Sequence, residues 1–471
     1  MQQRVAVIGA GWAGCAAAVA AVQQGLQVHV YEAAPHAGGR AKALAGVHLN
    51  HADKADTPAL DNGQHILLGA YSACLSLMQT VGVDSNAQLL RCALDLRDNQ
   101  GRGFALPPWA SPGDSAHAKA PALSGLNACI NEPLMALAAG WGLAINRSWP
   151  IHARVQLLGR LLGWRLRGFK CHSHATVADL CQGLHHSVMK GFIEPLCVSA
   201  LNISASQASG AVFLRVLKDA FLSGRGSSDL LLPRCDLSTL LVEPCLRWLH
   251  QHHAQVHTGT RVTGFLRTGG QWRVQTHTSK DGADTTTLYD HVIVATPAAQ
   301  AANLSWAHNT HWAHAAAALN HTAIATVYAS SSTALQWRAP MVALNNGMAQ
   351  FAFNRTALFG GGPATHVAAV VSDSGNGLTA PQSDSGRDDI TQAVMQQLRE
   401  EWPNAHWQWT QTVVEKRACF ACTPTAARPV MGIAPQLWAC ADYVAGPYPS
   451  TLEGAVRSGQ AVVGAIAAAN A

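Results

Sequence analysis

The alternation of apolar and polar residues near the N-terminus predicts a β-α-β unit. Residues 5–8 form a short apolar run that ends at a glycine, which is typical of a buried parallel strand. An alanine-rich stretch at 15–22 predicts a helix that Gly25 ends, and the apolar run at 26–31 predicts a second strand that ends at Glu32. Together these elements predict an α/β fold that begins with a parallel sheet.

Later segments continue the same pattern. Apolar runs at 292–297 and 437–441 predict two further strands, and a helix is expected to open at 451–459. A β-hairpin is expected at 260–278, where two adjacent glycines supply the turn. Residues 372–388 are rich in Ser, Asp, Gly, Asn and Pro, and we expect them to form an exposed loop.

A glycine-rich turn at residues 9–14 joins the first predicted strand to the helix. Gly9 permits a tight turn, Gly11 lets the backbone approach a pyrophosphate, and Gly14 lets the helix pack closely on the strand. Free N–H groups at the start of the helix favour a phosphate there, and Ala13 belongs to the same candidate site. Because the turn lies between a predicted strand and a predicted helix, it predicts a Rossmann-type dinucleotide site.

Glu32 and a Gly-Gly-Arg sequence extend this motif. Glu32 comes 18 residues after Gly14 and is expected to accept hydrogen bonds from the hydroxyls of an adenosine ribose. An acid at this position also disfavours a 2′-phosphate. Gly38, Gly39 and Arg40 offer backbone donors and a permanent cation for binding an anion.

The segment from Glu32 to Arg40 resembles the FAD-containing amine oxidase and phytoene desaturase superfamily, whose signature runs from the acid to Gly-Gly-Arg in the same way. The resemblance implies that FAD is the cofactor, with the double glycine against the flavin and Arg40 near the diphosphate. It also implies a Rossmann-type FAD-binding domain combined with a discontinuous α+β substrate domain.

Motifs further along the chain fit the same superfamily. The resemblance assigns Asp442 to the ribityl and phosphate region of the flavin, and Thr451 and Leu452 to a helix N-terminus aimed at the isoalloxazine. Val262 matches a valine that meets adenine through its backbone. Ala441 stands where the superfamily usually has a glycine before the aspartate, a departure that concerns the local geometry.

The order of these motifs predicts a discontinuous domain arrangement. A chain of 471 residues favours two domains over one compact core. Residues 1–90, 225–300 and 415–471 are expected to form the FAD-binding domain. Residues 91–224 and 301–414 are expected to form the substrate domain.

Residues 61–71 indicate a particular family within this superfamily. Together with Arg428-Pro429 and residues 449–455, they resemble hydroxysqualene dehydroxylase, also called squalene-associated FAD-dependent desaturase, of bacterial hopanoid synthesis. That family implies the reductive removal of an allylic hydroxyl, which turns hydroxysqualene into squalene. Such a reaction needs a proton donor at the leaving oxygen, a dry apolar channel and a rigid flavin.

The same segment supplies the candidate catalytic residues. His65 is the candidate acid and Asp61 its candidate partner; the alternative is that both only hold a loop against the flavin. Gly63 and Gln64 are assigned to the cofactor site. The sequence contains no second dinucleotide motif, so the electron donor is external and the sequence does not identify it.

Three other functions stay open at this point. A carotenoid or phytoene desaturase would use oxidised FAD, and an amine oxidase would usually need an aromatic cage, for which Tyr443 and Tyr448 are the candidates. A prenyl-binding escort protein, of the GDP-dissociation-inhibitor kind, would bind lipid without flavin chemistry. The intact glycines, Glu32, Arg40 and Asp442 argue against the escort.

Composition excludes some partners. A net charge of +5 is too small and too dispersed to predict a nucleic-acid partner. Twelve cysteines without a regular framework favour a reducing cytoplasm. The CxxC at 419–422 is a single pair, and Cys171, His172 and His174 have no matching pair at zinc spacing, so we expect no metal.

Residues 133–178 predict a peripheral contact with the inner face of the cytoplasmic membrane. The segment has no Asp or Glu, contains three tryptophans and carries six basic residues: Arg147, Arg154, Arg160, Arg165, Arg167 and Lys170. Leu157, Leu158, Leu161 and Leu162 fit one helical face, as in an interfacial helix on anionic lipid. A buried or substrate-capping helix is the alternative. No membrane-spanning segment is expected, because polar residues interrupt the uncharged stretch at 292–337.

Overall fold

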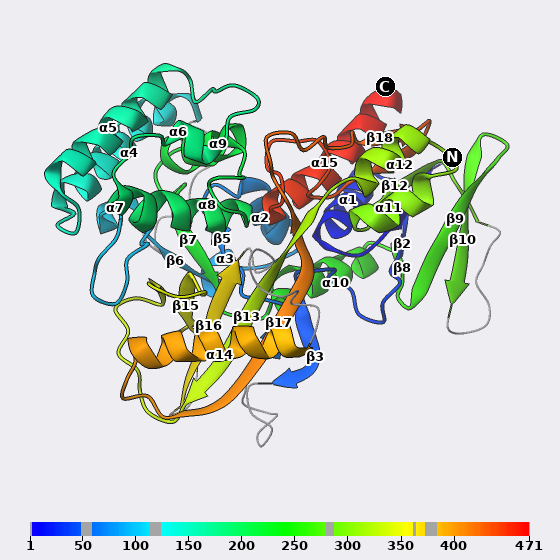
Figure 1. The fold of residues 1–471 in the computed structure, drawn as a ribbon. Coiled ribbons are helices and arrows are strands. Elements are labelled where there is room, and N and C mark those ends of the chain that lie inside the picture. The colour runs from blue at the N-terminus through cyan, green and yellow to red at the C-terminus, as the bar shows by residue number, and fades with distance from the viewer. Residues whose placement is uncertain are drawn as a thin grey trace.

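The computed structural model describes residues 2–48, 59–112, 124–278, 287–360, 364–372 and 384–470 (Figure 1). Its main parts are a six-stranded sheet, a five-stranded sheet and a lobe of helices. The six-stranded sheet draws its strands from residues 4–31, 255–294 and 432–439, whereas the five-stranded sheet draws its strands from residues 321–420. The chain therefore crosses between the two sheets more than once.

The six-stranded sheet contains the predicted β-α-β unit. In spatial order its strands are β18 (Gly432–Ala434), β19 (Leu437–Ala439), β12 (His291–Val294), β1 (Arg4–Ile8), β2 (Gln27–Tyr31) and β8 (Gln255–His257). β1 is parallel to both β2 and β12, with Ile8 opposite Tyr31 and Val294. The predicted strands are confirmed, although two of them end earlier than expected. Since parallel strands share their carboxyl ends, the loops after β1, β2 and β12 gather at one edge.

Helices α1 (Trp12–Gln23) and α15 (Leu452–Asn470) pack against each other beside this sheet, and α10 (Glu243–Gln251) packs on α1. Small residues allow the close approach of α1 and α15. A Cβ atom added at Gly459 would lie 2.4 Å from the carbonyl oxygen of Ala13. The C-terminal helix is thus fitted directly against the first helix of the chain.

The five-stranded sheet is antiparallel throughout. Its strands in spatial order are β14 (Met341–Ala343), β15 (Phe351–Asn354), β16 (Thr365–Ser372), β13 (His321–Ser331) and β17 (Trp407–Phe420). Helix α14 (Asp384–Glu401) lies across one face of this sheet and buries Ile390, Val394 and Leu398 (Figure 1). β17 continues past residue 415, the predicted start of the last FAD-binding segment.

The structure tests the predicted hairpin at 260–278 and part of the predicted loop at 372–388. The hairpin is confirmed as β9 (Thr260–Thr268) and β10 (Gln271–Thr278), and Gly269 and Gly270 both have positive φ, which suits a two-residue turn. The predicted loop at 372–388 is wrong at its end, because residues 384–388 begin α14. Residues 387–389 are exposed and Ile390 is buried, so the segment belongs to an amphipathic helix instead of a loop. Residues 373–383 lie outside the described part.

The helical lobe contains α4 (Ser124–Ile145), α5 (Ile151–Leu166), α6 (Val177–Leu180), α7 (His186–Val188), α8 (Glu194–Leu201) and α9 (Gly210–Leu222). Buried aromatic side chains, including Trp149, Trp164 and Phe192, form its core. The predicted single face of four leucines on α5 is wrong. Leu157 is fully buried, whereas Leu158 and Leu162 are exposed on the opposite side, because the helix packs inward through Ala153, Leu157 and Trp164.

Shorter elements join these parts. They are β3 (Ala43–His48), β4 (Ala59–Asp61), β5 (Leu67–Leu68), β6 (Leu89–Cys92), β7 (Leu230–Pro233), α2 (Ser72–Thr80), α3 (Ser85–Gln88), α11 (Ala298–Ser305), α12 (Thr310–Ala317) and α13 (Arg355–Phe359). In the part of the chain that the structure describes, no helix combines the length and the apolar character needed to cross a bilayer.

Candidate active site

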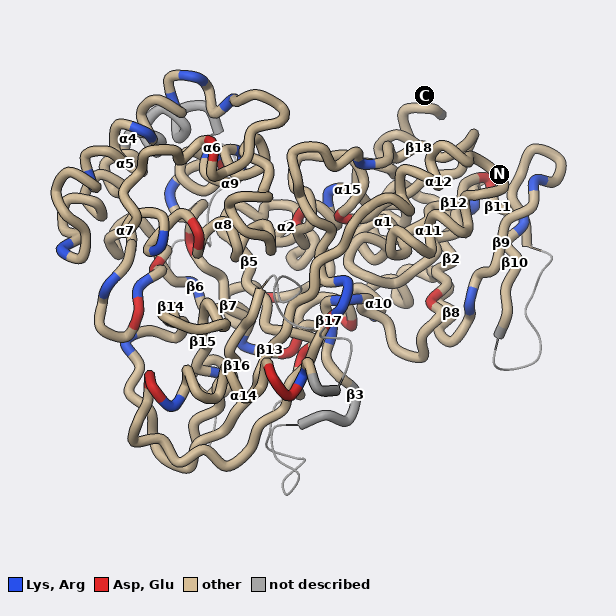
Figure 2. The backbone as a smooth tube through the Cα atoms, in the orientation of Figure 1, with Lys and Arg blue, Asp and Glu red and all other residues tan. Residues whose placement is uncertain are grey.

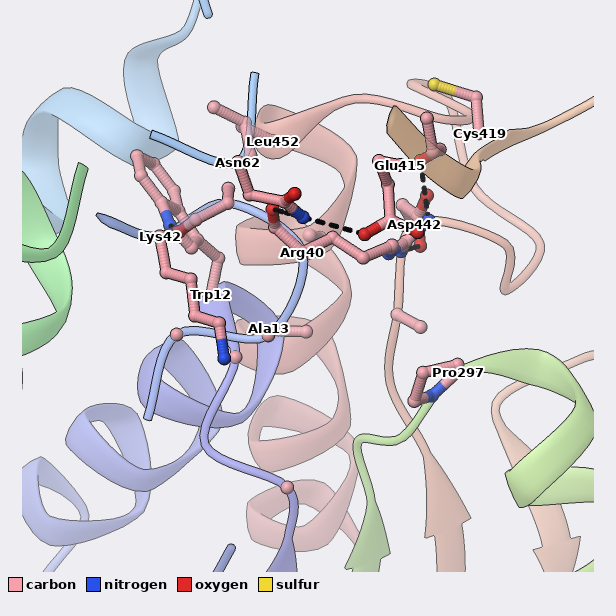
Figure 3. Close-up of a pocket in the computed structure, with 18 of the residues that line it drawn as sticks. Trp12, Ala13, Arg40, Lys42, Asn62, Pro297, Glu415, Cys419, Asp442 and Leu452 are labelled. Carbon is pink, nitrogen blue, oxygen red and sulfur yellow. Dashed lines mark hydrogen bonds and ion pairs between the residues drawn. The ribbon is translucent and has the colours of Figure 1, made fainter. Parts of the chain in front are cut away.

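A cavity of about 820 Å³ is lined by residues of both sheets and of helix α8 in the helical lobe. Figure 3 shows part of its lining. Its lining combines the loops after β1, β2 and β12 with residues of β13, β15, β16 and β17. A volume of this size is at the upper end of the range for small-molecule and cofactor sites.

The glycine-rich turn forms one wall of the cavity. Gly9 has a φ of +108°, and a Cβ atom there would lie 2.6 Å from the carbonyl oxygen of Ala295, so the turn requires glycine. Gly11 precedes the first residue of α1, and no side chain caps that helix. Its first N–H groups are therefore available to an anion, as expected for a pyrophosphate site.

Glu32 is held at the end of β2 by two backbone amides. Its Oε2 accepts a hydrogen bond from the N–H of Ala10 at 2.8 Å, and its Oε1 accepts one from Ala34 at 2.9 Å. Each oxygen keeps a second lone pair for a further donor. Because Glu32 also lines the cavity beside Val262, its carboxylate can receive sugar hydroxyls.

Arg40 connects the N-terminal and C-terminal motifs. Its guanidinium forms an ion pair of 2.5 Å with Asp442 and donates to the carbonyl oxygen of Ala418 at 2.8 Å. Burial on its own would lower the pKa of Arg40, but the adjacent Asp442 carboxylate raises it overall, so the residue stays cationic. Asn62 donates to the carbonyl oxygen of Arg40 and to Glu415, which fixes the same corner (Figure 3).

The start of α15 forms the wall beside α1. Thr451 Oγ1 caps this helix by accepting a hydrogen bond from the N–H of Gly454 at 2.9 Å. The fully buried carboxylate of Glu453 accepts bonds from the N–H groups of Ala73 and Cys74 at the start of α2, each at 3.0 Å. The N-terminus of α15 is thus fixed where the amides of Thr451 and Leu452 border the cavity.

The structure brings nearly all the sequence-predicted site residues to this one cavity. The lining includes Gly9, Gly11, Ala13, Glu32, Gly38, Gly39, Arg40, Gly63, Gln64, His65, Val262, Asp442, Thr451 and Leu452. Gly14 and Asp61 are not in the lining. Gly14 faces the sheet, where an added Cβ would lie 1.9 Å from the carbonyl oxygen of Gly9.

His65 is held by the backbone of its own loop. Its Nδ1 lies 3.0 Å from the carbonyl oxygen of Gly63, which can only accept, so Nδ1 carries the proton. Burial lowers the pKa of His65 below its ordinary value, and the positive charge of Arg40 lowers it further. The ring is therefore neutral at neutral pH, and it must gain a second proton before it can act as an acid.

Asp61 has other partners than His65. Its Oδ1 accepts a hydrogen bond from the N–H of Leu237 at 2.9 Å, and its Oδ2 lies 3.9 Å from a guanidinium nitrogen of Arg355. Burial raises the pKa of Asp61 to about 7, although Arg355 opposes the rise. The position of Asp61 supports the reading in which it fixes the loop that carries Gly63, Gln64 and His65.

Arg355, which was not among the predicted site residues, holds the loop that carries Gln64 and His65. Its side chain is fully buried and donates to Gln64 Oε1 and to the carbonyl oxygen of Ala59, each at 3.1 Å. Its guanidinium also lies 4.1 Å from the centre of the Phe359 ring. The only signal in the sequence was a single basic residue at the end of an apolar run, at 349–355.

The buried position of Asp61 makes the stability of the protein depend on pH. An unfolded Asp titrates near pH 4, whereas the pKa of Asp61 in the folded protein is about 7. Asp61 therefore contributes to the free energy of unfolding in full below about pH 4. This contribution falls as the pH rises from about 4 towards about 7, because the unfolded chain loses its proton first. Relative to Asp61→Asn, the free energy of unfolding should fall by at most about 4 kcal/mol across this interval.

Urea unfolding of both proteins at a series of pH values measures this difference. Asn can still accept the Leu237 hydrogen bond, so the fold should be kept. Parallel pH profiles for the two proteins would mean that Asp61 does not titrate in this interval.

A second half of the cavity is largely apolar. None of its residues was among the predicted site residues; they are Ser199 and Ala200 of α8, Gln300, Asn303 and Leu304 of α11, Ile66, Ile324, Phe351, Phe353, Val370 and Ser372. Tyr443 and Tyr448 are absent from the described lining. Tyr443 donates its hydroxyl to the carbonyl oxygen of Thr296, and Tyr448 lies under the guanidinium groups of Arg215 and Arg457.

Comparison with known proteins decides the family. The family described as flavin containing amine oxidoreductase matches residues 12–467, which is nearly the whole chain. The chain belongs to this family. Membership in the flavin containing amine oxidoreductases makes the protein a flavin-dependent oxidoreductase, and the nucleotide half of the cavity is where the chain would hold the flavin cofactor.

Several relatives carry names that bear on the substrate. The chain is 27% identical to the hydroxysqualene dehydroxylase of Rhodopseudomonas palustris over 64% of each chain. It is 23% identical to that of Sinorhizobium fredii over 98% of this chain and 97% of the relative. A shorter match, 37% identical, covers 18% of this chain and 13% of the zeta-carotene desaturase of Zea mays. The names of the first two relatives specify hydroxysqualene, and the name of the third specifies zeta-carotene.

Solved structures agree on the fold. An oxidoreductase from Methanosarcina mazei superposes with a TM-score of 0.66 at 14% identity and covers 98% of this chain and 100% of its own. The α/β fold expected from the sequence is thereby confirmed.

Proposed function

We propose that the flavin is FAD and that the enzyme reductively removes the allylic hydroxyl of hydroxysqualene to give squalene. The observation that carries this proposal is one continuous cavity with two chemically different halves. The half around Glu32, Gly11 and Arg40 suits a dinucleotide, and the half around Phe351 and Phe353 suits a hydrocarbon chain. The hydroxysqualene dehydroxylase relatives support the same assignment.

The dinucleotide half fits FAD along its length. Glu32 would bind the adenosine ribose, and the free N–H groups at the start of α1 would face the pyrophosphate. Arg40 and Asp442 would lie near the ribityl chain, and the capped start of α15 would face the isoalloxazine. When bound and reduced, the flavin would supply a hydride.

The residues of this chain would supply the rest of the reaction. The leaving hydroxyl must gain a proton to depart as water, and His65 is the titratable cavity residue that we assign to this task. The apolar half would hold the chain and exclude water from the allylic carbon. The balance is one hydride and one proton added to the alcohol, giving the hydrocarbon and water, with two electrons supplied by an external donor.

A carotenoid desaturase is the second candidate. The match to zeta-carotene desaturase favours it, as does the neutral state of His65, which could accept a proton instead of donating one. An amine oxidase is less well supported, because neither Tyr443 nor Tyr448 lines the described cavity.

The reaction can be tested with the purified flavoprotein under anaerobic conditions. After the flavin has been reduced chemically, hydroxysqualene should be converted to squalene while the flavin reoxidises in equal amount. Conversion of a carotene by the oxidised protein, with hydroxysqualene left unchanged, would support the desaturase instead.

We also propose that the protein works in the cytoplasm, at the inner face of the cytoplasmic membrane, through residues 133–178. A substrate of about thirty carbons is almost insoluble in water, because each methylene favours an apolar phase by about 0.8 kcal/mol. An enzyme for such a substrate should collect it from a bilayer.

A further inference from the structure

Helix α5 presents a row of apolar side chains to solvent. Their spacing of four, three, four and four residues puts them on one side of the helix. Their exposed fractions are 71% for Ile151, 63% for Val155, 51% for Leu158, 55% for Leu162 and 80% for Leu166. The opposite side of the same helix holds it in the lobe through Ala153, Leu157 and Trp164. The outward row is therefore not needed for packing the lobe.

Helix α4 adds a second apolar row at the same edge of the molecule. Leu137, Trp141 and Ile145 are spaced by four residues and are each more than half exposed. α4 and α5 lie side by side at the end of the lobe that is farthest from the six-stranded sheet (Figure 1). We call these two rows the outer apolar face. Soluble proteins rarely expose an apolar surface of this extent unless it binds something.

Basic residues lie near this face, in a segment of the sequence that contains no acid. Arg147, Arg167 and Lys170 are exposed. The sequence has no Asp or Glu between residues 133 and 178, and Figure 2 shows blue basic positions along the tube of α4 and α5. Arg160 instead holds the lobe together, because it donates to the carbonyl oxygens of Leu180 and Gln182. The positive rim therefore rests on the residues near the two ends of α5.

We propose that the outer apolar face docks onto a bilayer that contains anionic phospholipid. The apolar rows would enter the boundary between headgroups and acyl chains, and the basic residues would meet the lipid phosphates. A second copy of this chain fits the face less well, because a symmetric contact would bring together two positive rims with no acid in either segment.

The docking face and the cavity belong to the same lobe. Helix α8 lines the cavity with Ser199 and Ala200, α8 packs on α9, and α9 packs on α4. This inference deepens the proposed membrane contact and rests on it, but it does not depend on which isoprenoid is converted. A test of attachment can therefore fail while the proposed reaction succeeds, and the reverse also holds.

Co-sedimentation with vesicles of phosphatidylcholine and phosphatidylglycerol tests the docking face on the whole flavoprotein. The parent protein should sediment with these vesicles and be released by high salt. The variant Val155→Glu/Leu162→Glu should lower the partition coefficient by about tenfold or more, because two exposed apolar side chains would be replaced by charges of the wrong sign. Flavin content and turnover of substrate in detergent should stay at the parental level.

Matched variants elsewhere control for a general effect. Leu266 and Val430 are exposed to a similar degree, so Leu266→Glu/Val430→Glu should bind vesicles as the parent does. Arg167→Glu/Lys170→Glu should reduce binding mainly at low salt, whereas Arg247→Glu/Arg399→Glu on α10 and α14 should not.

Three results would overturn the proposal. The parent could fail to bind anionic vesicles, the Val155/Leu162 variant could bind as well as the parent, or the control variants could lose binding equally. Light scattering on the same proteins shows whether the outer apolar face mediates self-association instead of membrane binding. A parent dimer that becomes a monomer in the Val155/Leu162 variant, without vesicle binding in either, would make the face a contact between copies.

Discussion

Replacing Gly11 with valine should give a folded protein that purifies without FAD. An added Cβ at Gly11 would meet nothing closer than the Cα of Gly39 at 3.7 Å, and the backbone there has an ordinary φ of −80°. The valine methyl groups would instead fill the space that the pyrophosphate needs. We expect less than about a tenth of the parental flavin content.

Two measurements separate cofactor loss from misfolding. Circular dichroism should show parental helix content, and added FAD should stabilise the parent by about 2.7 kcal/mol at a hundredfold excess over Kd while leaving the variant unchanged. Gly432→Val is the matched control, because Gly432 lies in β18 with no atom within 4 Å of an added Cβ.

Gly14→Val should behave differently from Gly11→Val. A Cβ at Gly14 would lie 1.9 Å from the carbonyl oxygen of Gly9, so α1 could not pack on β1 and the protein should not fold. A Gly11→Val protein that folds and retains stoichiometric FAD would overturn the assignment of the dinucleotide site.

Replacing His65 with phenylalanine should lower the rate of hydroxysqualene conversion by about 10²- to 10⁴-fold, the range for removal of a general acid. Flavin content should be unchanged, because His65 bonds only to its own loop in the described structure. The readout is a single turnover from the reduced flavin, so that the identity of the electron donor does not enter.

The pH profile of the parent gives an independent check on the acid. Burial and Arg40 lower the pKa of His65, so the imidazolium form is populated only at pH values below the ordinary range of histidine. The rate should therefore rise as the pH falls towards that pKa and should decline as the pH rises above it. His65→Phe should lose this dependence.

His65→Asn distinguishes the acid from a loop anchor. The Asn amide can replace Nδ1–H as a donor to the carbonyl oxygen of Gly63, but it cannot ionise. A parental rate in His65→Asn would show that the residue only holds the loop, and another proton donor would have to be sought.

The nucleotide half of the site was predictable because its signals are local. Gly9, Gly11 and Gly14 lie in one turn between a strand and a helix, and Glu32 ends the next strand, so a single β-α-β unit sets their relative positions. The resemblance then supplied Arg40 and Asp442, and the structure joins these two residues in an ion pair across 402 positions of sequence.

The apolar half was not predictable, because it is assembled from short pieces of distant elements. Leu304 of α11, Ile324 of β13, Phe353 of β15 and Val370 of β16 each look like ordinary core residues in the sequence. Arg355 likewise gains its role only when α13 is placed beneath the loop that carries Gln64.

Sequence alone determined the β-α-β unit and its glycine-rich turn, since backbone geometry and the spacing of glycines fix them within one local unit. It also determined that residues 133–178 are basic and predicted a helix around residues 157–162. Only the tertiary structure decided which side of α5 faces outward. Helical spacing shows that apolar residues share a face, but it does not show whether that face is buried or exposed. Helix α5 has two apolar faces, so the sequence could not decide between them. The packing of Leu157 and Trp164 into the lobe turns Leu158 and Leu162 to solvent.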